Sequence, residues 1–219
     1  MSSNRLTGYD KALRELKDMA IAESITVRQH VAEAVQTLAQ DGLTDDWRVK
    51  DDIIDRYRDA IVDRSFELMT WQQLRAQDLR WILGFQRIAQ ELERIADYAC
   101  DLAELSQLRP TRIHPQEIGE MTRQLLVMLD FDVSILKDER AIDRDLDELD
   151  DVLDALYAQF RQELVREDEK SKTSVDLGVS LLLARTIERM GDHAVNVAEM
   201  VLYVQTGKRR IGAAEAPSP

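Results

Sequence analysis

A pattern of thirteen residues occurs twice in this chain, at 92–104 and again at 187–199, with 95 residues between equivalent positions. The first copy reads LERIADYACDLAE and the second reads IERMGDHAVNVAE. Counted from Glu93 or Glu188, polar residues stand at relative positions 0, 4, 8 and 11, which lie within about 80° of one another around a helix. Apolar residues occupy another side. The repeat therefore predicts two copies of one helical unit, each with an acidic stripe.

The composition favours long helices and disfavours several classes of partner. The 219 residues include only 8 glycines and 4 prolines, while 32% are charged. The net charge of −13 repels nucleic acid, and the short basic run Lys208-Arg209-Arg210 does not compensate it. Because no apolar run is long enough to span a bilayer, we expect a soluble, cytoplasmic protein that is not inserted in a membrane.

Cys100 is the only cysteine, which excludes an intramolecular disulfide and a thiolate metal cage. Its neighbours along the helix, Ala96, Ala99 and Ala103, predict a small packing residue.

Hydrophobic periodicity predicts six helices and no strands. They span about residues 8–40, 44–71, 76–108, 116–129, 149–164 and 174–206, and the stretch 131–145 has a mixed period. Pro110 and Pro115 mark the clearest break, since two prolines five residues apart cannot both sit inside a helix. We expect an all-α fold of two tandem three-helix bundles related by internal duplication. The predicted units are 1–108 and 116–207, joined by a linker at 109–115 and followed by a disordered tail at 208–219.

A second helix in each half carries carboxylates that could face the stripe. Asp51, Asp55 and Asp59 are spaced four apart in the first half, and Asp150 and Asp154 form the best pair in the second. Converging carboxylates repel one another, and a cation relieves that repulsion. All-oxygen ligands suit hard ions such as Mg, Mn, Ca or ferric iron. The alternative is that these acids are only the solvated faces of amphipathic helices.

Two segments resemble the E-x-x-x-D signatures of the PhoU family, regulators of bacterial phosphate uptake. They are Glu93-Arg94-Ile95-Ala96-Asp97 and Glu188-Arg189-Met190-Gly191-Asp192. Asp78-Leu79-Arg80 and the ending at 201–207 also match, so that the resemblance covers about residues 9–207. The sequence departs from the family pattern at two places. Thr173 stands where the second copy of Asp78 would be, and the family's usual proline a few residues before Asp78 is missing.

The resemblance implies metal binding, including multinuclear clusters, at these signatures. Glu93, Asp97, Glu188 and Asp192 match them directly, whereas Asp51, Asp55, Asp150 and Asp154 follow from their place on the neighbouring helices. His193 is either a further ligand or a residue that orients its neighbour.

The resemblance also implies a non-enzymatic regulatory adaptor that restrains phosphate uptake and phosphate-starvation signalling. Its expected partners are a phosphate transporter's ATPase subunit and a sensor histidine kinase, and a homodimer is plausible. We expect no catalytic residues and no organic cofactor site.

Two alternatives remain open. A di-metal carboxylate oxidase needs Glu-x-x-His motifs, and none of His30, His114 and His193 has an acid three residues before it. A purely structural helical protein is the other alternative, because fold alone does not determine function.

Overall fold

The computed structural model describes residues 8–39, 47–70, 74–108, 115–138, 145–167 and 174–208. These ranges form six helices and contain no strand, which confirms the predicted all-α fold. The helices are α1 (Gly8–Thr37), α2 (Trp47–Met69), α3 (Ala76–Ser106), α4 (Pro115–Leu136), α5 (Asp145–Glu167) and α6 (Ser174–Thr206).

The helix ends differ from the prediction by a few residues. Helix α6 has the predicted bounds, whereas α1 and α3 end slightly earlier. Pro115 belongs to α4 as its first residue, where a proline's missing amide is not needed and its fixed φ suits the helix. In the stretch of mixed period, α4 continues to Leu136 and α5 starts at Asp145. The predicted helix start at 44, the linker residues 109–114 and the tail from 209 lie outside the described residues.

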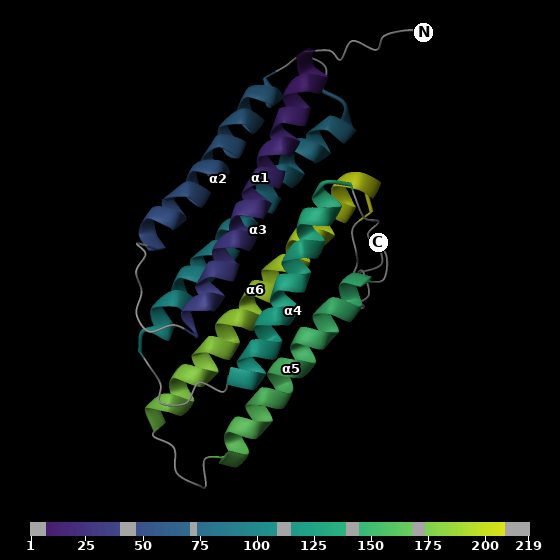
Figure 1. Cartoon of the computed structure of the whole chain (residues 1–219). Coiled ribbons are helices and arrows are strands. Elements are labelled where there is room, and N and C mark those ends of the chain that lie inside the picture. The colour runs from purple at the N-terminus through teal and green to yellow at the C-terminus, as the bar shows by residue number, and fades with distance from the viewer. Residues whose placement is uncertain are drawn as a thin grey trace, which may run out of the picture.

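Each half packs its own three helices together, and two helix pairs join the halves (Figure 1). The most extensive helix–helix contact of the described chain is between α3 and α6, and α1 also packs on α4. Helices α2 and α5 lie on opposite outer sides and contact only helices of their own half. The repeat units are therefore two three-helix bundles packed against each other.

The repeated apolar face forms the centre of this packing. Three residues of α3 and their equivalents 95 residues later in α6 are almost completely buried: Ile88 and Leu183, Leu92 and Ile187, Ile95 and Met190. Helices α3 and α6 run antiparallel, since Glu91 contacts Asn196 while the earlier Gly84 lies beside the later Val204. The halves are thus related by an approximate twofold axis. The rings of the equivalent residues Tyr98 and His193 lie next to this axis, with centroids 5.6 Å apart.

The two outlying stretches of the sequence resemblance meet in the fold. Asp78 caps α3 by accepting a hydrogen bond from the backbone N–H of Arg75 at 3.1 Å. Arg80 lies over the ring of Tyr203 at 5.9 Å. Gly207 ends α6 with a φ of 74°, a conformation that favours glycine, and a β-carbon there would also collide with Arg80. These residues therefore have a structural role at the junction of α3 and α6.

Candidate functional site

The eight predicted ligands form two groups, one in each half. Asp51 and Asp55 of α2 and Glu93 and Asp97 of α3 make up what we call the N-terminal cluster. Burial raises the pKa of Asp51, and the charges of Asp97, Asp55 and Glu93 raise it further. The pKa of Asp97 is raised by burial and by Asp55, against the opposing effect of Arg94. The carboxylates of α2 and α3 thus lie near one another, as the sequence predicted, and one guanidinium contacts both Asp55 and Glu93.

Asp150 and Asp154 of α5 and Glu188 and Asp192 of α6 make up the C-terminal cluster. Burial, followed by the charges of Asp154 and Asp192, raises the pKa of Asp150 to about 6. The pKa of Glu188 is also raised, by burial first and then by Asp192. The acids predicted on α5 and α6 therefore also lie close enough to repel one another.

Neither cluster is a closed cage. Within the described ranges, no three His, Cys, Asp or Glu side chains are arranged so that they could hold a metal ion as they stand. The donor chemistry nevertheless suits a hard cation, because every member offers carboxylate oxygens. One atom of the C-terminal cluster also lacks a partner: Glu188 Oε2 is buried without a hydrogen bond. The C-terminal carboxylates therefore have the donor chemistry of a hard-cation site, while Arg185 contacts the other oxygen of Glu188 at 2.5 Å.

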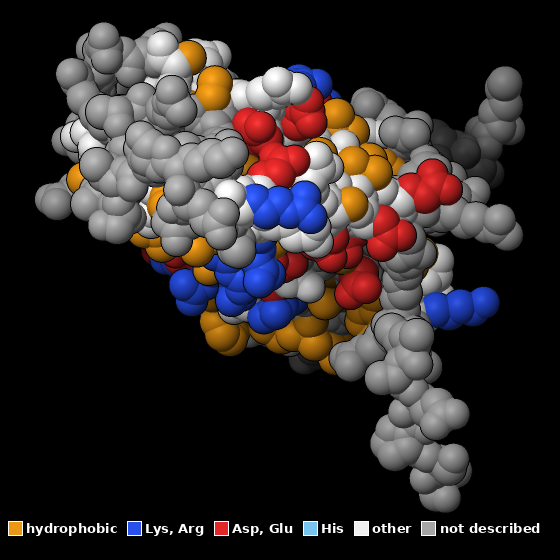
Figure 2. All heavy atoms as spheres, turned by 90° about the horizontal axis from the view of Figure 1, so that it is seen from below, with side chains coloured by type: hydrophobic (Ala, Val, Ile, Leu, Met, Phe, Trp, Pro, Cys, Tyr) orange, Lys and Arg blue, Asp and Glu red, His pale blue; other side chains and the backbone are white. Residues whose placement is uncertain are grey.

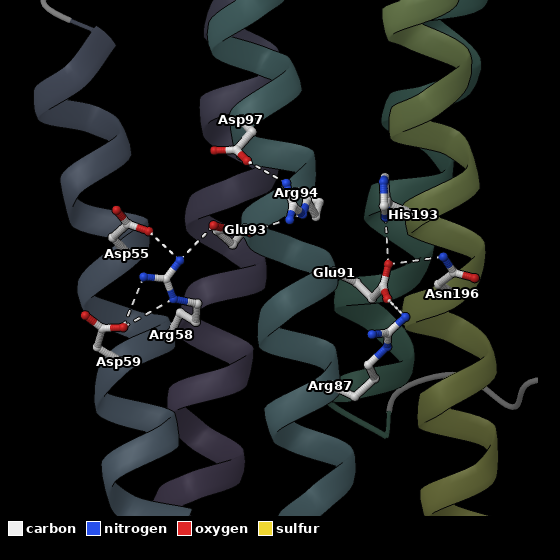
Figure 3. A network of polar contacts seen from close by, with 10 residues as sticks. All are labelled: Asp55, Arg58, Asp59, Arg87, Glu91, Glu93, Arg94, Asp97, His193 and Asn196. Atoms are coloured by element: carbon white, nitrogen blue, oxygen red, sulfur yellow. Dashed lines mark hydrogen bonds and ion pairs between the residues drawn. The ribbon is translucent and has the colours of Figure 1, made fainter.

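The N-terminal cluster contains a residue that the sequence reasoning missed, Arg58 of α2 (Figure 3). Its Nη1 atom lies 2.9 Å from Asp55 Oδ1 and 2.7 Å from Glu93 Oε1, and Nη2 lies 3.1 Å from Asp59. Arg94 lies more loosely, 3.8 Å from Glu93 and 3.6 Å from Asp97. Asp59, which the sequence placed on the same stripe, is thus a partner of Arg58.

A second polar network joins the two halves (Figure 3). Glu91 of α3 is 3% exposed. Its carboxylate contacts His193 Nδ1 at 2.6 Å, accepts a hydrogen bond from Asn196 at 3.1 Å and forms an ion pair with Arg87 at 2.5 Å. Burial alone would raise the pKa of Glu91, but the hydrogen bonds from His193 and Asn196 and the charge of Arg87 hold it below its usual value. His193 thus binds across the interface, away from the stripe of its own helix.

A cavity of about 410 Å³ lies between this interface network and the N-terminal cluster and is lined by residues of both. Its lining mixes basic, amide and acidic groups, and the guanidinium groups are already paired with the carboxylates beside them. The lining residues are Arg58, Arg87, Gln90, Glu91, Glu93, Arg94, His193 and Asn196.

Two residues of α1 also approach the N-terminal cluster. Glu23 is completely buried and neither of its carboxyl oxygens has a hydrogen-bond partner. Burial, moderated by Arg58 and reinforced by Glu93, raises its pKa to about 9. His30 is buried against Trp47, and its Nε2 lies 3.4 Å from Cys100 Sγ. Cys100 is half-buried, so it packs between helices much as its alanine neighbours predicted.

On the end of the molecule seen in Figure 2, the described acidic and basic side chains form separate small patches beside hydrophobic ones, with no continuous basic surface among them. None of the described helices is both long and apolar enough to cross a bilayer.

Comparison with known proteins agrees with this architecture. The family model for the PhoU domain matches twice, at residues 23–106 and 118–201. The phosphate-specific transport system accessory protein PhoU homolog of Clostridium acetobutylicum is 32% identical over 73% of this chain and 76% of its own length. PhoU homolog 1 of Thermotoga maritima is 27% identical over 91% of this chain and 90% of its own.

Solved structures show the same fold. The crystal structure of PhoU from Pseudomonas aeruginosa superposes with a TM-score of 0.82 at 25% identity, covering 91% of this chain and all of that one. PhoU from Streptococcus pneumoniae superposes with a TM-score of 0.79 at 21% identity, over 93% of this chain and 99% of its own. With two domain matches that together span most of its length, the chain belongs to the PhoU family.

Proposed function

We propose that this protein is a regulatory adaptor of phosphate uptake. The observation that carries the proposal is the pair of PhoU domains, each a three-helix bundle, in a chain whose relatives are named as phosphate-specific transport system accessory proteins. The adaptor restrains the transporter and phosphate-starvation signalling by contacting the transporter's ATPase subunit and a sensor histidine kinase. Those contacts place it in the cytoplasm.

The proposed mechanism uses surfaces and no catalytic group. The carboxylates of each cluster lie between an outer helix and a central one, so a hard cation bound there would join α2 to α3 or α5 to α6. Such an ion neutralises carboxylates that otherwise repel one another. Stiffening an outer helix in this way would stabilise one docking surface for a partner. Homodimer formation belongs to the same proposal.

Deleting the gene tests the regulatory role. A strain without the protein should express phosphate-starvation genes in high phosphate, because the restraint on the kinase is gone, and the intact gene should restore repression. Transcript levels and uptake of labelled phosphate are the measurements. If both remain unchanged in the deletion strain, the protein is not a phosphate regulator.

A further inference from the structure

The cavity between the N-terminal cluster and the interface network is basic, although the chain as a whole is acidic. Its lining includes three arginines and two glutamates, so its walls carry one positive charge in excess when His193 is counted as neutral. The whole chain has a net charge of −13. Helices α2, α3 and α6 supply the lining residues, and Figure 3 shows all of them except Gln90. We call this space the arginine cavity.

The two glutamates of the arginine cavity already have partners. Glu91 Oε1 contacts Arg87 at 2.5 Å, and its Oε2 contacts the two polar residues of α6. Glu93 Oε1 accepts a hydrogen bond from Arg58 Nη1 at 2.7 Å. Each carboxylate is therefore balanced by one guanidinium, and the third arginine provides the excess charge.

That third arginine, Arg94, has hydrogen-bonding capacity to spare. Within the described chain its guanidinium approaches Glu93 at 3.8 Å and Asp97 at 3.6 Å, both longer than a hydrogen bond. Its side chain is 62% exposed, and that of Arg87 is 55% exposed. Arg87, Gln90 and Arg94 stand at positions i, i+3 and i+7 of α3, so they share one face of the helix over about 10 Å of its length. A ligand in the arginine cavity would therefore meet a row of donors with a guanidinium at each end.

The duplicated architecture does not by itself demand these donors. At a separation of 95 residues, Arg87 corresponds to Leu182 and Asp101 corresponds to Asn196. Leu182 is 52% exposed, so the fold has no need of a cation at that position. The charge pattern of the arginine cavity is thus a property of one place in the molecule and is not repeated at the place related to it by the twofold axis.

These donors suit an anionic phosphoryl group. The planar guanidinium binds carboxylates and phosphates through paired hydrogen bonds. A planar carboxylate is satisfied by one guanidinium, whereas the three oxygens of a phosphoryl group point in different directions and can accept from donors on several helices. The volume of about 410 Å³ lies within the range of about 300–1,000 Å³ that is usual for small-molecule sites. Inorganic phosphate and small phosphate monoesters share this chemistry.

We propose that the arginine cavity binds the phosphoryl group of inorganic phosphate or of a small phosphate monoester, and that Arg94 and Arg87 hold this group. Arg58 forms one wall of the site, and His193 and Asn196 of α6 form the other. A bound ligand would contact both halves of the molecule at once. The proposal stands apart from the proposed function, because it concerns binding by the isolated protein.

Titration calorimetry tests the proposal on protein that has been freed of metal ions with a chelator and then dialysed, so that phosphate bridged by a cation is not counted. The probes are inorganic phosphate, AMP and acetate, at low chloride concentration. At least one of the two phosphoryl probes should bind. Acetate should bind at least about tenfold more weakly, the effect of losing one hydrogen bond to a charged group. Binding of inorganic phosphate alone identifies the free anion as the ligand, and tighter binding of AMP identifies a monoester.

Arg94→Gln should weaken this binding about tenfold or more and leave the circular dichroism spectrum unchanged, because its two long, exposed ion pairs contribute little to stability. Arg189→Gln is the matched control, since Arg189 has the same position in the second repeat and does not line the cavity. Arg87→Leu should also weaken binding. It is combined with Glu91→Gln so that no buried carboxylate is left without its cation.

Three outcomes overturn the proposal. They are the failure of both inorganic phosphate and AMP to bind at millimolar concentration, acetate binding as tight as that of the phosphoryl probes, and an Arg94→Gln variant that loses no more affinity than Arg189→Gln. None of these results bears on the deletion-strain phenotype, which decides the regulatory role by itself.

Discussion

Three buried carboxyl groups show how strongly the immediate partners of a residue determine its charge. Glu91 has hydrogen bonds with His193 and Asn196 and an ion pair with Arg87, which favour its ionised form despite burial. Glu23 has no hydrogen-bond partner, and Asp132 is buried with an unpartnered Oδ2. Burial raises the pKa of both. The protonated carboxyl is the form in which such groups can be buried without a counter-charge.

Glu23 should make stability fall as the pH rises from 4.5 to about 9. Its pKa is about 9 in the folded chain, above the ordinary value of 4.5. Because the folded chain holds the proton of Glu23 more tightly than the unfolded chain does, this proton stabilises the fold. The stabilisation is complete below pH 4.5 and is lost as the pH rises through about 9. Glu23→Gln removes this titration, so wild type should lose stability relative to the variant as the pH rises from 4.5 to about 9, and the difference should level off above that pH. Urea unfolding at each pH measures the difference.

Glu15→Gln is the control for this experiment, because Glu15 lies on the same helix with a side chain that is 45% exposed. It should follow the wild-type pH profile. A difference between wild type and Glu23→Gln that stays constant with pH would contradict a protonated Glu23.

At the scale of helices, the closeness of α3 and α6 depends on a small residue. A β-carbon at Gly84 would lie 2.1 Å from Val204 Cγ2, closer than two carbon atoms can approach. Valine is branched at its β-carbon and has little rotamer freedom in a helix, so it cannot easily turn aside. Glycine at this position therefore allows the two central helices to pack closely.

Gly84→Ala should lower the free energy of unfolding by about 1 kcal/mol, because overpacking costs about 1–3 kcal/mol and the gain in helix propensity returns about 1 kcal/mol. In a Val204→Ala background the collision is removed, and the same substitution should then stabilise the protein by a few tenths of a kcal/mol or more. A double-mutant cycle from urea unfolding measures the coupling. Equal effects in the two backgrounds would show that the helices are not in close contact here.

The whole molecule should unfold as one cooperative unit, although its sequence is a duplication. The most extensive helix contact lies between the halves, at α3 and α6, and α1 with α4 adds a second connection. Two ion pairs at the second connection, Arg28 with Asp130 and Lys17 with Asp138, also cross between the halves. Neither half therefore buries its central helix completely without the other.

The tryptophans make this testable, since all three, Trp47, Trp71 and Trp81, belong to the first half. Leu183→Ala in the second half should cost about 2–5 kcal/mol, because Leu183 is fully buried. If unfolding is cooperative, the tryptophan fluorescence transition should shift to lower urea together with circular dichroism. A fluorescence transition that does not move would mean that the halves unfold independently.

The sequence by itself determined the six helices, the duplication and the placement of acids on two pairs of helices. These features follow from local periodicity: the spacing of apolar residues decides which face of a helix is buried, and prolines and glycines limit its length. Helix α6 has its predicted bounds, Ser174–Thr206, so local sequence can define even the ends of a long helix. Conversely, Pro115 was placed in the linker because a proline that ends one helix and a proline that starts the next look alike in sequence.

Only the tertiary structure decided which charges meet. Arg58 looked like one more surface residue until α2 was placed against α3, where it bridges Asp55 and Glu93. Glu91 and His193 are 102 positions apart and belong to different repeats. Such contacts depend on the rotation and axial shift of one helix against another, to within about one residue's rise of 1.5 Å. That register is the result of packing many buried side chains at once, and no short stretch of sequence contains it.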